Sequence, residues 1–415
     1  MTKRHFINIE RIINPIKTPL SPLRGEALNV VEHIDNAFIT VTDGMISQLG
    51  RMADFSAKQE PVTDMSSQWI LPCWVDSHTH TVFAKYRSEE FRQRMQGRSY
   101  QEIAASGGGI LNSARRLSDM SEDELLKGAV ERLQLIIGKG TGAVEIKSGY
   151  GLTLEDEIKM LRVIKKLGSI SPIPVKATFL GAHALPAKYK DRRTDYLDLI
   201  CHEMIPQIAS EGLADYCDAF CETGYFTVDE TERVIQKAAE FDIKAKIHTN
   251  QFTSIGGIQM AVRNGAKSVD HLEIMTDEDI TSLSNSDTIA TLLPIAPFFL
   301  KDPYPRGRQM ADANCALALA SDFNPGSAPS HDMALAINLA CNYCGLTPEE
   351  AFNSATINGA HAMDIQAMAG TISVGYPASF VAYRQMESLA EIPYRVCSEL
   401  IENVIIKGEF YDGKI

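Results

Sequence analysis

Residues 70–80 read ILPCWVDSHTH, a short apolar run that ends in two histidines separated by one residue. An apolar run of this length is consistent with a buried β-strand. In an extended segment residues i and i+2 point to the same side, so His78 and His80 are expected to face one point. The stretch therefore predicts a strand that carries a pair of imidazoles at its carboxyl end.

Seven further apolar runs follow this one, and helical stretches separate them. The eight runs are residues 70–75, 142–146, 175–180, 216–221, 243–247, 267–269, 288–293 and 317–320. Alternation of strands and helices predicts βαβ units and a parallel sheet. Eight such units over about 300 residues fit an α/β protein of the (β/α)₈ TIM-barrel class. A doubly wound open sheet is the structural alternative.

The two ends of the chain share a different pattern. Residues 37–49 (AFITVTDGMISQL) alternate apolar and polar side chains around Asp43-Gly44, which predicts a hairpin. Residues 370–383 and 404–411 also alternate. Because chain termini often lie close together, we expect residues 1–68 and 370–415 to form one small β-sandwich domain, with the barrel at residues 69–369.

Charge and composition narrow the class of protein. The 415 residues carry a formal net charge of −13, which disfavours nucleic acid and anionic lipid as partners. The first residues, MTKRHFINIERI, contain no apolar core of signal-peptide length. The longest apolar stretch, residues 288–300, contains Pro294 and Pro297 and is too short to span a bilayer. Eight cysteines without a signal segment predict reduced thiols and a cytoplasmic protein.

Side chains suited to metal binding recur just after the predicted strands. His183 follows the third run, His248 the fifth, His271 the sixth and Asp322 the eighth. The carboxyl ends of barrel strands meet at one mouth, where this architecture places its active site. Histidines with a carboxylate suit Zn²⁺ or Fe²⁺, and such an ion lowers the pKa of a bound water to about 7. A remaining histidine could then transfer a proton to a leaving nitrogen.

These positions resemble the amidohydrolase superfamily. More narrowly, the sequence is similar to the imidazolonepropionase family, whose members open the imidazolone ring in histidine degradation. The resemblance covers essentially the whole chain. It rests on residues 76–80 with Arg87, 145–151 (EIKSGYG), 179–183 (FLGAH), 270–273 (DHLE) and 321–327 (SDFNPGS).

The resemblance implies a role for each matching residue. It implies one divalent metal ion, Zn²⁺ or Fe²⁺, on His78, His80, His248 and Asp322. His271 would be the proton shuttle. The implied substrate is the small anion 4-imidazolone-5-propanoate, and the product is N-formimino-L-glutamate. Contacts to it are implied for Arg87, Tyr150, His183, Asn324, Gly326 and Ser327.

The sequence departs from part of the family at Gln251, where some members carry a carboxylate. A glutamine cannot exchange a proton, so Gln251 is expected only to orient the substrate by hydrogen bonds. Proton transfer is then expected to fall to His271 and Asp322.

Several alternatives are compatible with the same residues. Another cyclic amide or amidine hydrolase, such as a deaminase, would use similar ligands, and a non-catalytic barrel used for assembly is a more remote possibility. Glu222 ends the fourth run, where relatives with two metals place a bridging ligand, so a second metal on Glu222 and His271 is conceivable. A homodimer is expected for an enzyme of this size.

Overall fold

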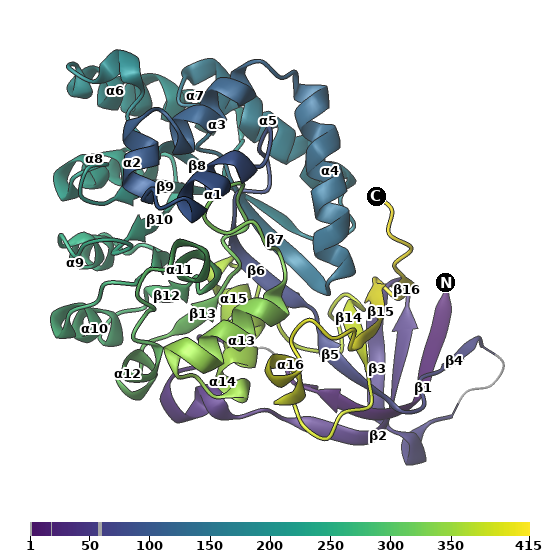
Figure 1. Ribbon diagram of the computed structural model, residues 1–415. Coiled ribbons are helices and arrows are strands. Elements are labelled where there is room, and N and C mark those ends of the chain that lie inside the picture. The colour runs from purple at the N-terminus through teal and green to yellow at the C-terminus, as the bar shows by residue number, and fades with distance from the viewer. Residues whose placement is uncertain (1, 18, 57–59) are drawn as a thin grey trace.

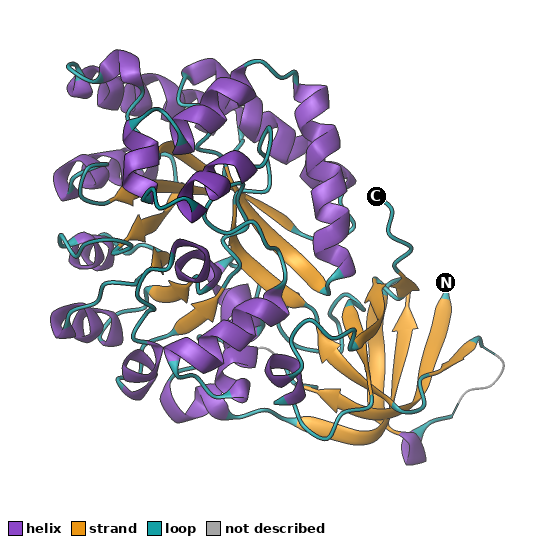
Figure 2. Cartoon of the chain, viewed as in Figure 1, coloured by secondary structure: helices purple, strands orange, loops and turns teal. Residues whose placement is uncertain are grey.

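The computed structural model describes residues 2–17, 19–56 and 60–415 and contains two sheets. Figures 1 and 2 show a ring of parallel strands surrounded by helices, with a second sheet beside it where the two chain ends lie near each other. Residues 1, 18 and 57–59 of the segment predicted to form the small domain lie outside the described residues.

The barrel sheet contains eight parallel strands that pair in chain order, which confirms the predicted (β/α)₈ class. The strands are β6 (Trp74–Thr79), β7 (Thr141–Lys147), β8 (Val175–Ala182), β9 (Tyr216–Cys221), β10 (Lys244–Thr249), β11 (Ser268–His271), β12 (Ile289–Leu292) and β13 (Leu317–Leu319).

The barrel closes between β6 and the segment that follows β13. Thr79 and Phe323 form an isolated parallel bridge. The backbone N–H of Asp322 donates to the carbonyl of His78 at 3.0 Å, and that of His80 donates to the carbonyl of Phe323 at 2.8 Å. Peptide groups of the predicted metal ligands therefore join the first strand to the last.

The helices lie around the barrel and over its mouth (Figure 1). They are α1 (Ser88–Met95), α2 (Tyr100–Ala105), α3 (Gly109–Ser118), α4 (Glu122–Gly138), α5 (Leu154–Ile170), α6 (Arg193–Leu199), α7 (Ile205–Glu211), α8 (Val228–Ala239), α9 (Gly257–Arg263), α10 (Asp277–Ser284), α11 (Ile295–Leu300), α12 (Gly307–Asp312), α13 (Met333–Cys344), α14 (Pro348–Ala355), α15 (Ile357–Ala362) and α16 (Glu391–Tyr394). Several begin with local capping signals. Ser121 and Glu124 form a capping box at the start of α4, as Thr227 and Glu230 do for α8. No helix in the described ranges is both long enough and apolar enough to cross a membrane.

Both ends of the chain join the second sheet. Its strands are β1 (Lys3–Ile13), β2 (His33–Thr42), β3 (Met45–Arg51), β4 (Val62–Asp64), β5 (Gln68–Pro72), β14 (Phe380–Arg384), β15 (Ile401–Ile406) and β16 (Glu409–Phe410). The strands expected to form a β-sandwich are hydrogen-bonded as one mixed sheet, in the order β16-β15-β14-β5-β1-β2-β3 with β4 beside β1. The predicted hairpin connects β2 and β3. Its turn residues Asp43 and Gly44 have φ of 49° and 78°, as a two-residue hairpin turn requires.

The run predicted as one barrel strand, residues 70–75, is divided between the two sheets. Its first part belongs to β5, which pairs with β1 and β14, and its last part belongs to β6. Side chains of β5 alternate between two cores, since Ile70 packs in the core of the second sheet and Leu71 in the core of the barrel. We propose that the second sheet is a domain formed by residues 1–68 and 370–415, with its first segment extended to Pro72 because β5 is paired there.

Candidate active site

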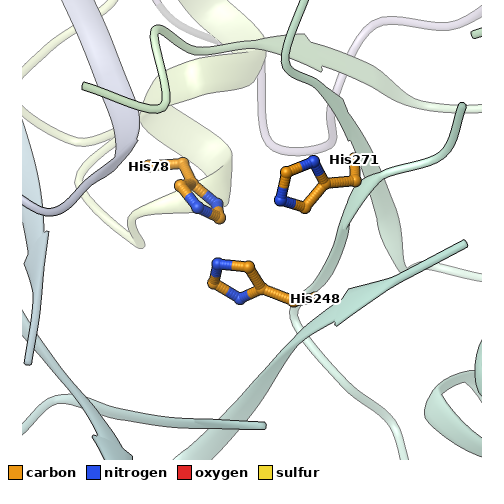
Figure 3. Close-up of side chains that lie close together, drawn as sticks. All are labelled: His78, His248 and His271. Carbon is orange, nitrogen blue, oxygen red and sulfur yellow. The ribbon is translucent and has the colours of Figure 1, made fainter. Parts of the chain in front are cut away.

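The predicted ligand side chains converge at the carboxyl end of the barrel. Figure 3 shows the imidazoles of His78, His248 and His271 facing one another, from β6, β10 and β11. The ring centroids lie 4.4 Å apart for His78 and His248, and 5.3 Å apart for His248 and His271. His80 lies just after β6 and Asp322 just after β13, so their side chains complete the cluster.

The polar atoms of this cluster are close enough to share one ion. The Nε2 atoms of His78 and His80 each lie 3.6 Å from Oδ1 of Asp322. The Nε2 atoms of His80 and His248 are 3.4 Å apart. Two overlapping groups have ligand atoms within 4.8 Å of one another, namely His78 with His80 and Asp322, and His78 with His248 and His271. The structure thus places His271 in the same cluster as the four predicted ligands.

Backbone geometry at the strand ends aims these side chains inward. His271 has a φ of 90° and Asp322 a φ of 54°. Positive φ is uncommon for residues other than glycine and often marks functional positions. At Asp322 it is held by the N–H bond to the carbonyl of His78, which also closes the barrel.

Two carboxylates fix the orientation of two histidines. Nδ1 of His78 lies 2.7 Å from Oδ2 of Asp270, and Nδ1 of His248 lies 2.8 Å from Oδ2 of Asp218. A carboxylate only accepts hydrogen bonds, so each Nδ1 is the donor and each Nε2 lone pair faces the centre. Within the described part of the chain, Nε2 of His78 is buried and has no hydrogen-bond partner.

The carboxylates that orient these histidines were not predicted from the sequence, although the sequence contains a signal for such residues. Asp218 and Lys246 are charged residues inside apolar strands, and both are fully buried. Charged residues are almost never fully buried unless they are paired. Such positions in a predicted barrel strand could therefore have indicated partners of the site.

The electrostatic environment separates the histidines into two kinds. Burial, together with nearby cationic groups including Lys147, lowers the pKa values of His78, His80 and His248 well below the usual range. Burial also opposes protonation of His271, but the Glu273 carboxylate 3.3 Å from its Nδ1 outweighs it and raises the pKa of His271 to about 9. The first three imidazoles are therefore neutral at pH 7, and His271 is protonated.

Burial has opposite consequences for the pKa values of Asp322 and of His183, a buried histidine beside the cluster. It raises the pKa of Asp322 to about 7. It lowers the pKa of His183 to about 4, against the opposing effect of the bond to the carbonyl of Gly149. The carboxyl of Asp322 can therefore bind or release a proton near neutral pH.

Tyr150 and His183 lie beside His80. The ring of His183 stacks on that of His80 with centroids 5.4 Å apart, and the ring of Tyr150 lies 5.7 Å from His80. Nδ1 of His183 donates to the carbonyl of Gly149 at 2.9 Å. Gln251 is buried two residues beyond the end of β10. The rings of Tyr150 and His183 therefore border the ligand cluster.

The loop that holds Tyr150 is fixed by a buried carboxylate that sequence reasoning did not single out. Glu157, in α5, accepts hydrogen bonds from the backbone N–H groups of Gly149, Gly151 and Leu152 at 3.1, 2.7 and 2.9 Å. The side chain therefore sets the path of the chain through the EIKSGYG stretch.

The loop after β13 folds around Asn324. Its Nδ2 donates to Oδ2 of Asp322 at 2.9 Å, and its Oδ1 accepts from the N–H groups of Gly326 and Ser327 at 2.8 Å each. Asn324 thereby holds one oxygen of Asp322 and turns the loop toward Arg87, whose backbone N–H donates to the carbonyl of Pro325 at 2.8 Å. The predicted residues of this loop and Arg87 therefore form one unit at the mouth.

The carboxylate of Glu222, which was considered for a second metal, is hydrogen-bonded to the chain around it. It accepts from the N–H groups of Thr223, Phe252 and Thr253 at 2.7, 2.9 and 3.2 Å. It also bonds the hydroxyl of Thr253. These bonds hold the loop after β10 against the end of β9.

Comparison with known proteins finds relatives over nearly the whole chain. The profile of the Amidohydrolase family matches residues 69–411. An imidazolonepropionase of Flavobacterium johnsoniae is 48% identical over 403 residues, which cover 97% of this chain and 98% of that protein. An imidazolonepropionase of Clostridium tetani is 40% identical, with 92% of each chain covered.

Solved structures with low sequence identity share the fold. Guanine deaminase of E. coli superposes with a TM-score of 0.73 at 14% identity and covers 99% of both chains. A triazine hydrolase variant superposes with a TM-score of 0.73 at 13% identity, covering 99% of this chain and 94% of that one. At these identities the likeness extends to the architecture alone.

Proposed function

Since the chain belongs to the amidohydrolase family, and within it to the imidazolonepropionases, we propose how its residues hydrolyse the imidazolone ring of the substrate. The enzyme hydrolyses the cyclic amide C–N bond of 4-imidazolone-5-propanoate to N-formimino-L-glutamate in histidine degradation.

We assign one divalent ion, Zn²⁺ or Fe²⁺, to His78, His80, His248 and Asp322. The observation that carries this assignment is the buried Nε2 of His78, which has no hydrogen-bond partner within the described residues while Nδ1 is bonded to Asp270. Neutral imidazoles with a carboxylate are a donor set suited to either ion. When bound, such an ion polarises a substrate carbonyl and lowers the pKa of a water to about 7.

One ion, and not two, fits the bonding of Glu222. A bridging ligand needs lone pairs directed at both metals, but both oxygens of Glu222 accept hydrogen bonds from the chain around it. Binding a second ion there would break these bonds and release the loop that follows β10.

His271 supplies the proton to the departing ring nitrogen. Its Nδ1 is held by Glu273, and its raised pKa keeps the imidazole protonated at neutral pH. A protonated imidazole has no lone pair to offer a metal, which separates His271 from the three neutral histidines. Asp322 has the second catalytic role. Because Asn324 bonds its Oδ2, its Oδ1 faces His78 and His80 and can accept a proton from the attacking water.

The substrate is bound between Arg87 and the loop after β13. The guanidinium of Arg87 pairs with the propanoate carboxylate, since its fork of donors matches a carboxylate. Asn324, Gly326 and Ser327 line the same end, and Tyr150, His183 and Gln251 orient the imidazolone ring. Among these residues, only Gly326 and Ser327 are partly exposed.

For the whole molecule we propose a homodimer in the cytoplasm that acts on this small anion without a nucleic-acid or membrane partner. The net charge of −13 supports the last part, because nucleic acids and anionic lipids select basic surfaces. Sedimentation of the purified protein tests the dimer. A single species of monomer mass at micromolar concentration would refute it.

The direct test combines turnover with metal analysis. Purified enzyme is expected to contain close to one equivalent of Zn or Fe and to open the ring of 4-imidazolone-5-propanoate. His78→Ala is expected to lose both the metal and the activity. Metal-free protein with full turnover, or two equivalents of metal at full occupancy, would overturn the assignment.

A further inference from the structure

Two lysines lie inside the barrel beneath the ligand cluster. Lys147, in β7, and Lys246, in β10, are both 0% exposed. Burying an ammonium group is costly unless it is paired and hydrogen-bonded. Their partners are three equally buried carboxylates, those of Glu145, Asp218 and Asp270.

Lys147 contacts all three carboxylates. Its Nζ lies 2.7 Å from Oε1 of Glu145, 3.0 Å from Oδ2 of Asp218 and 3.6 Å from Oδ2 of Asp270. These partners come from β7, β9 and β11. One ammonium group therefore connects three strands around the interior of the barrel.

Two of these oxygens also hold histidines of the site. Oδ2 of Asp218 accepts from Nδ1 of His248, and Oδ2 of Asp270 accepts from Nδ1 of His78. The remaining oxygens are also bonded, since Oδ1 of Asp218 accepts from the N–H of His248 and Oδ1 of Asp270 from the hydroxyl of Ser268. Each carboxylate is thus fixed between a histidine on one side and Lys147 on the other.

We infer that Lys147 is a positioning residue for the metal centre, which ties the carboxylate partners of His78 and His248 together and so fixes both imidazoles with Nε2 facing the ion. The inference rests on the proposed metal site and deepens it. Groups that orient metal-binding histidines typically contribute 10- to 100-fold to metal affinity or activity, and Lys147 acts on two such groups at once.

Lys147 fixes the positions of the Asp218 and Asp270 carboxylates through its charge as well as through its contacts. Without Lys147, Asp218 and Asp270 would each lose their cationic partner in a dry interior, because Lys246 pairs with Glu145 alone. Repulsion between buried carboxylates would move them apart. The two imidazoles that they hold would then turn with them.

Lys246 provides a matched control. It is the same residue type, equally buried, and its Nζ pairs with Oε2 of Glu145 at 2.5 Å and with the carbonyl of Ser77 at 2.7 Å. No ion pair joins it to Asp218 or Asp270 among the described residues. Lys246→Met removes the same charge from the same interior without releasing the carboxylates that orient the histidines.

The experiment compares Lys147→Met, Lys246→Met and wild type in two measurements that do not depend on turnover. The first is Zn²⁺ affinity by competition with a chelator, and the second is the visible spectrum of the Co²⁺-substituted protein, which reports ligand geometry. Lys147→Met is expected to bind Zn²⁺ about 10- to 100-fold more weakly and to show an altered Co²⁺ spectrum. Lys246→Met is expected to stay close to wild type in both, although both variants lose thermal stability.

The outcomes separate this inference from the proposed function. If wild type binds no divalent ion, the proposed metal site is wrong. If wild type binds the ion but Lys147→Met keeps its affinity and spectrum, or if Lys246→Met changes them equally, Lys147 has no special positioning role. Should Lys147→Met fail to fold, Lys147→Arg keeps the charge but alters the geometry of the contacts, and a wild-type affinity and spectrum in that variant would likewise overturn the inference.

Discussion

The guanidinium of Arg87 lies directly against the α-carbon of Gly326. A β-carbon added to Gly326 would come within 1.9 Å of Nη2 and 2.2 Å of Nε of Arg87. Only glycine at this position leaves Arg87 where it is. The loop after β13 and the proposed carboxylate-binding group are therefore matched to each other in shape.

Gly326→Ala is accordingly expected to displace Arg87 and weaken substrate binding. A hydrogen bond to a charged group is worth about 1.5–3 kcal/mol, so KM should rise by roughly 10- to 150-fold while metal content stays at wild type. Arg87→Lys should raise KM similarly, because an ammonium cannot form the paired bonds of a guanidinium. Steady-state kinetics with metal analysis checks both variants, and an unchanged KM in Gly326→Ala would contradict the assigned role of Arg87.

His271 and His248 are expected to respond differently to the same substitution. His271→Ala should lose about 10²–10⁴-fold in turnover, the range for a general acid–base group, and keep its metal. His248→Ala should lose metal and turnover together. The metal-to-protein ratio measured beside kcat distinguishes the two roles. An empty metal site in His271→Ala would make His271 a ligand, whereas near-normal turnover would move proton transfer to another group such as Asp322.

Glu273 sets the pH range in which His271 can donate. The carboxylate favours the protonated imidazole and raises its pKa to about 9, so a rate that needs this proton falls as pH rises through that value. Glu273→Gln removes the charge and lowers the pKa of His271. The alkaline limb of the kcat profile should therefore move to lower pH.

A buried glutamate that does not pair with His271 serves as the control for that experiment. Glu222→Gln should leave the alkaline limb in place, because its carboxylate bonds the loop after β10 and not His271. An alkaline limb that is the same in Glu273→Gln and wild type would mean that another group supplies the proton.

Glu157 is expected to matter for both stability and substrate binding. Glu157→Gln exchanges one acceptor oxygen for an NH₂ group, which leaves at least one buried N–H of residues 149–152 without a partner, at a cost of about 1–3 kcal/mol. The free energy of unfolding in urea should fall by that amount, and KM should rise as Tyr150 moves. The exposed neighbour Glu155→Gln should change neither quantity. Equal stability of the two variants would show that the loop does not depend on this carboxylate.

The fold could be predicted from the sequence because the barrel strands are buried on both faces and read as separate apolar runs. The same property explains the error at residues 70–75. Two buried strands joined at Cys73 form one uninterrupted apolar run, and composition does not record that Leu71 and Val75 belong to different sheets.

For the site, sequence could predict the side chains that sit at strand ends, such as His80 and Asp322, because barrel topology alone brings those ends together. It could not predict the partners deeper in the barrel. Asp218 meets His248 across adjacent strands, and His78 meets Asp270 across the barrel, so both pairs depend on register and closure. The protonation of His271 likewise depends on Glu273. The Glu273 carboxylate reaches the imidazole because the backbone turns with positive φ at His271 and Leu272.

The hydrogen bond from the backbone N–H of Asp322 to the carbonyl of His78 has a consequence for the folding and the degradation of the protein. The site's residues lie at nearly opposite ends of the barrel sequence, so a nascent chain cannot complete the site until its eighth strand has emerged and docked on the first. An ion bound at the site would bind the closed barrel and not the open chain. It would therefore stabilise the closed barrel by RT ln(1 + [L]/Kd), where [L] is the concentration of the free ion. Depleting the ion in a cell would then first open the barrel between β6 and β13, and expose the edges of both strands to proteases and to other chains.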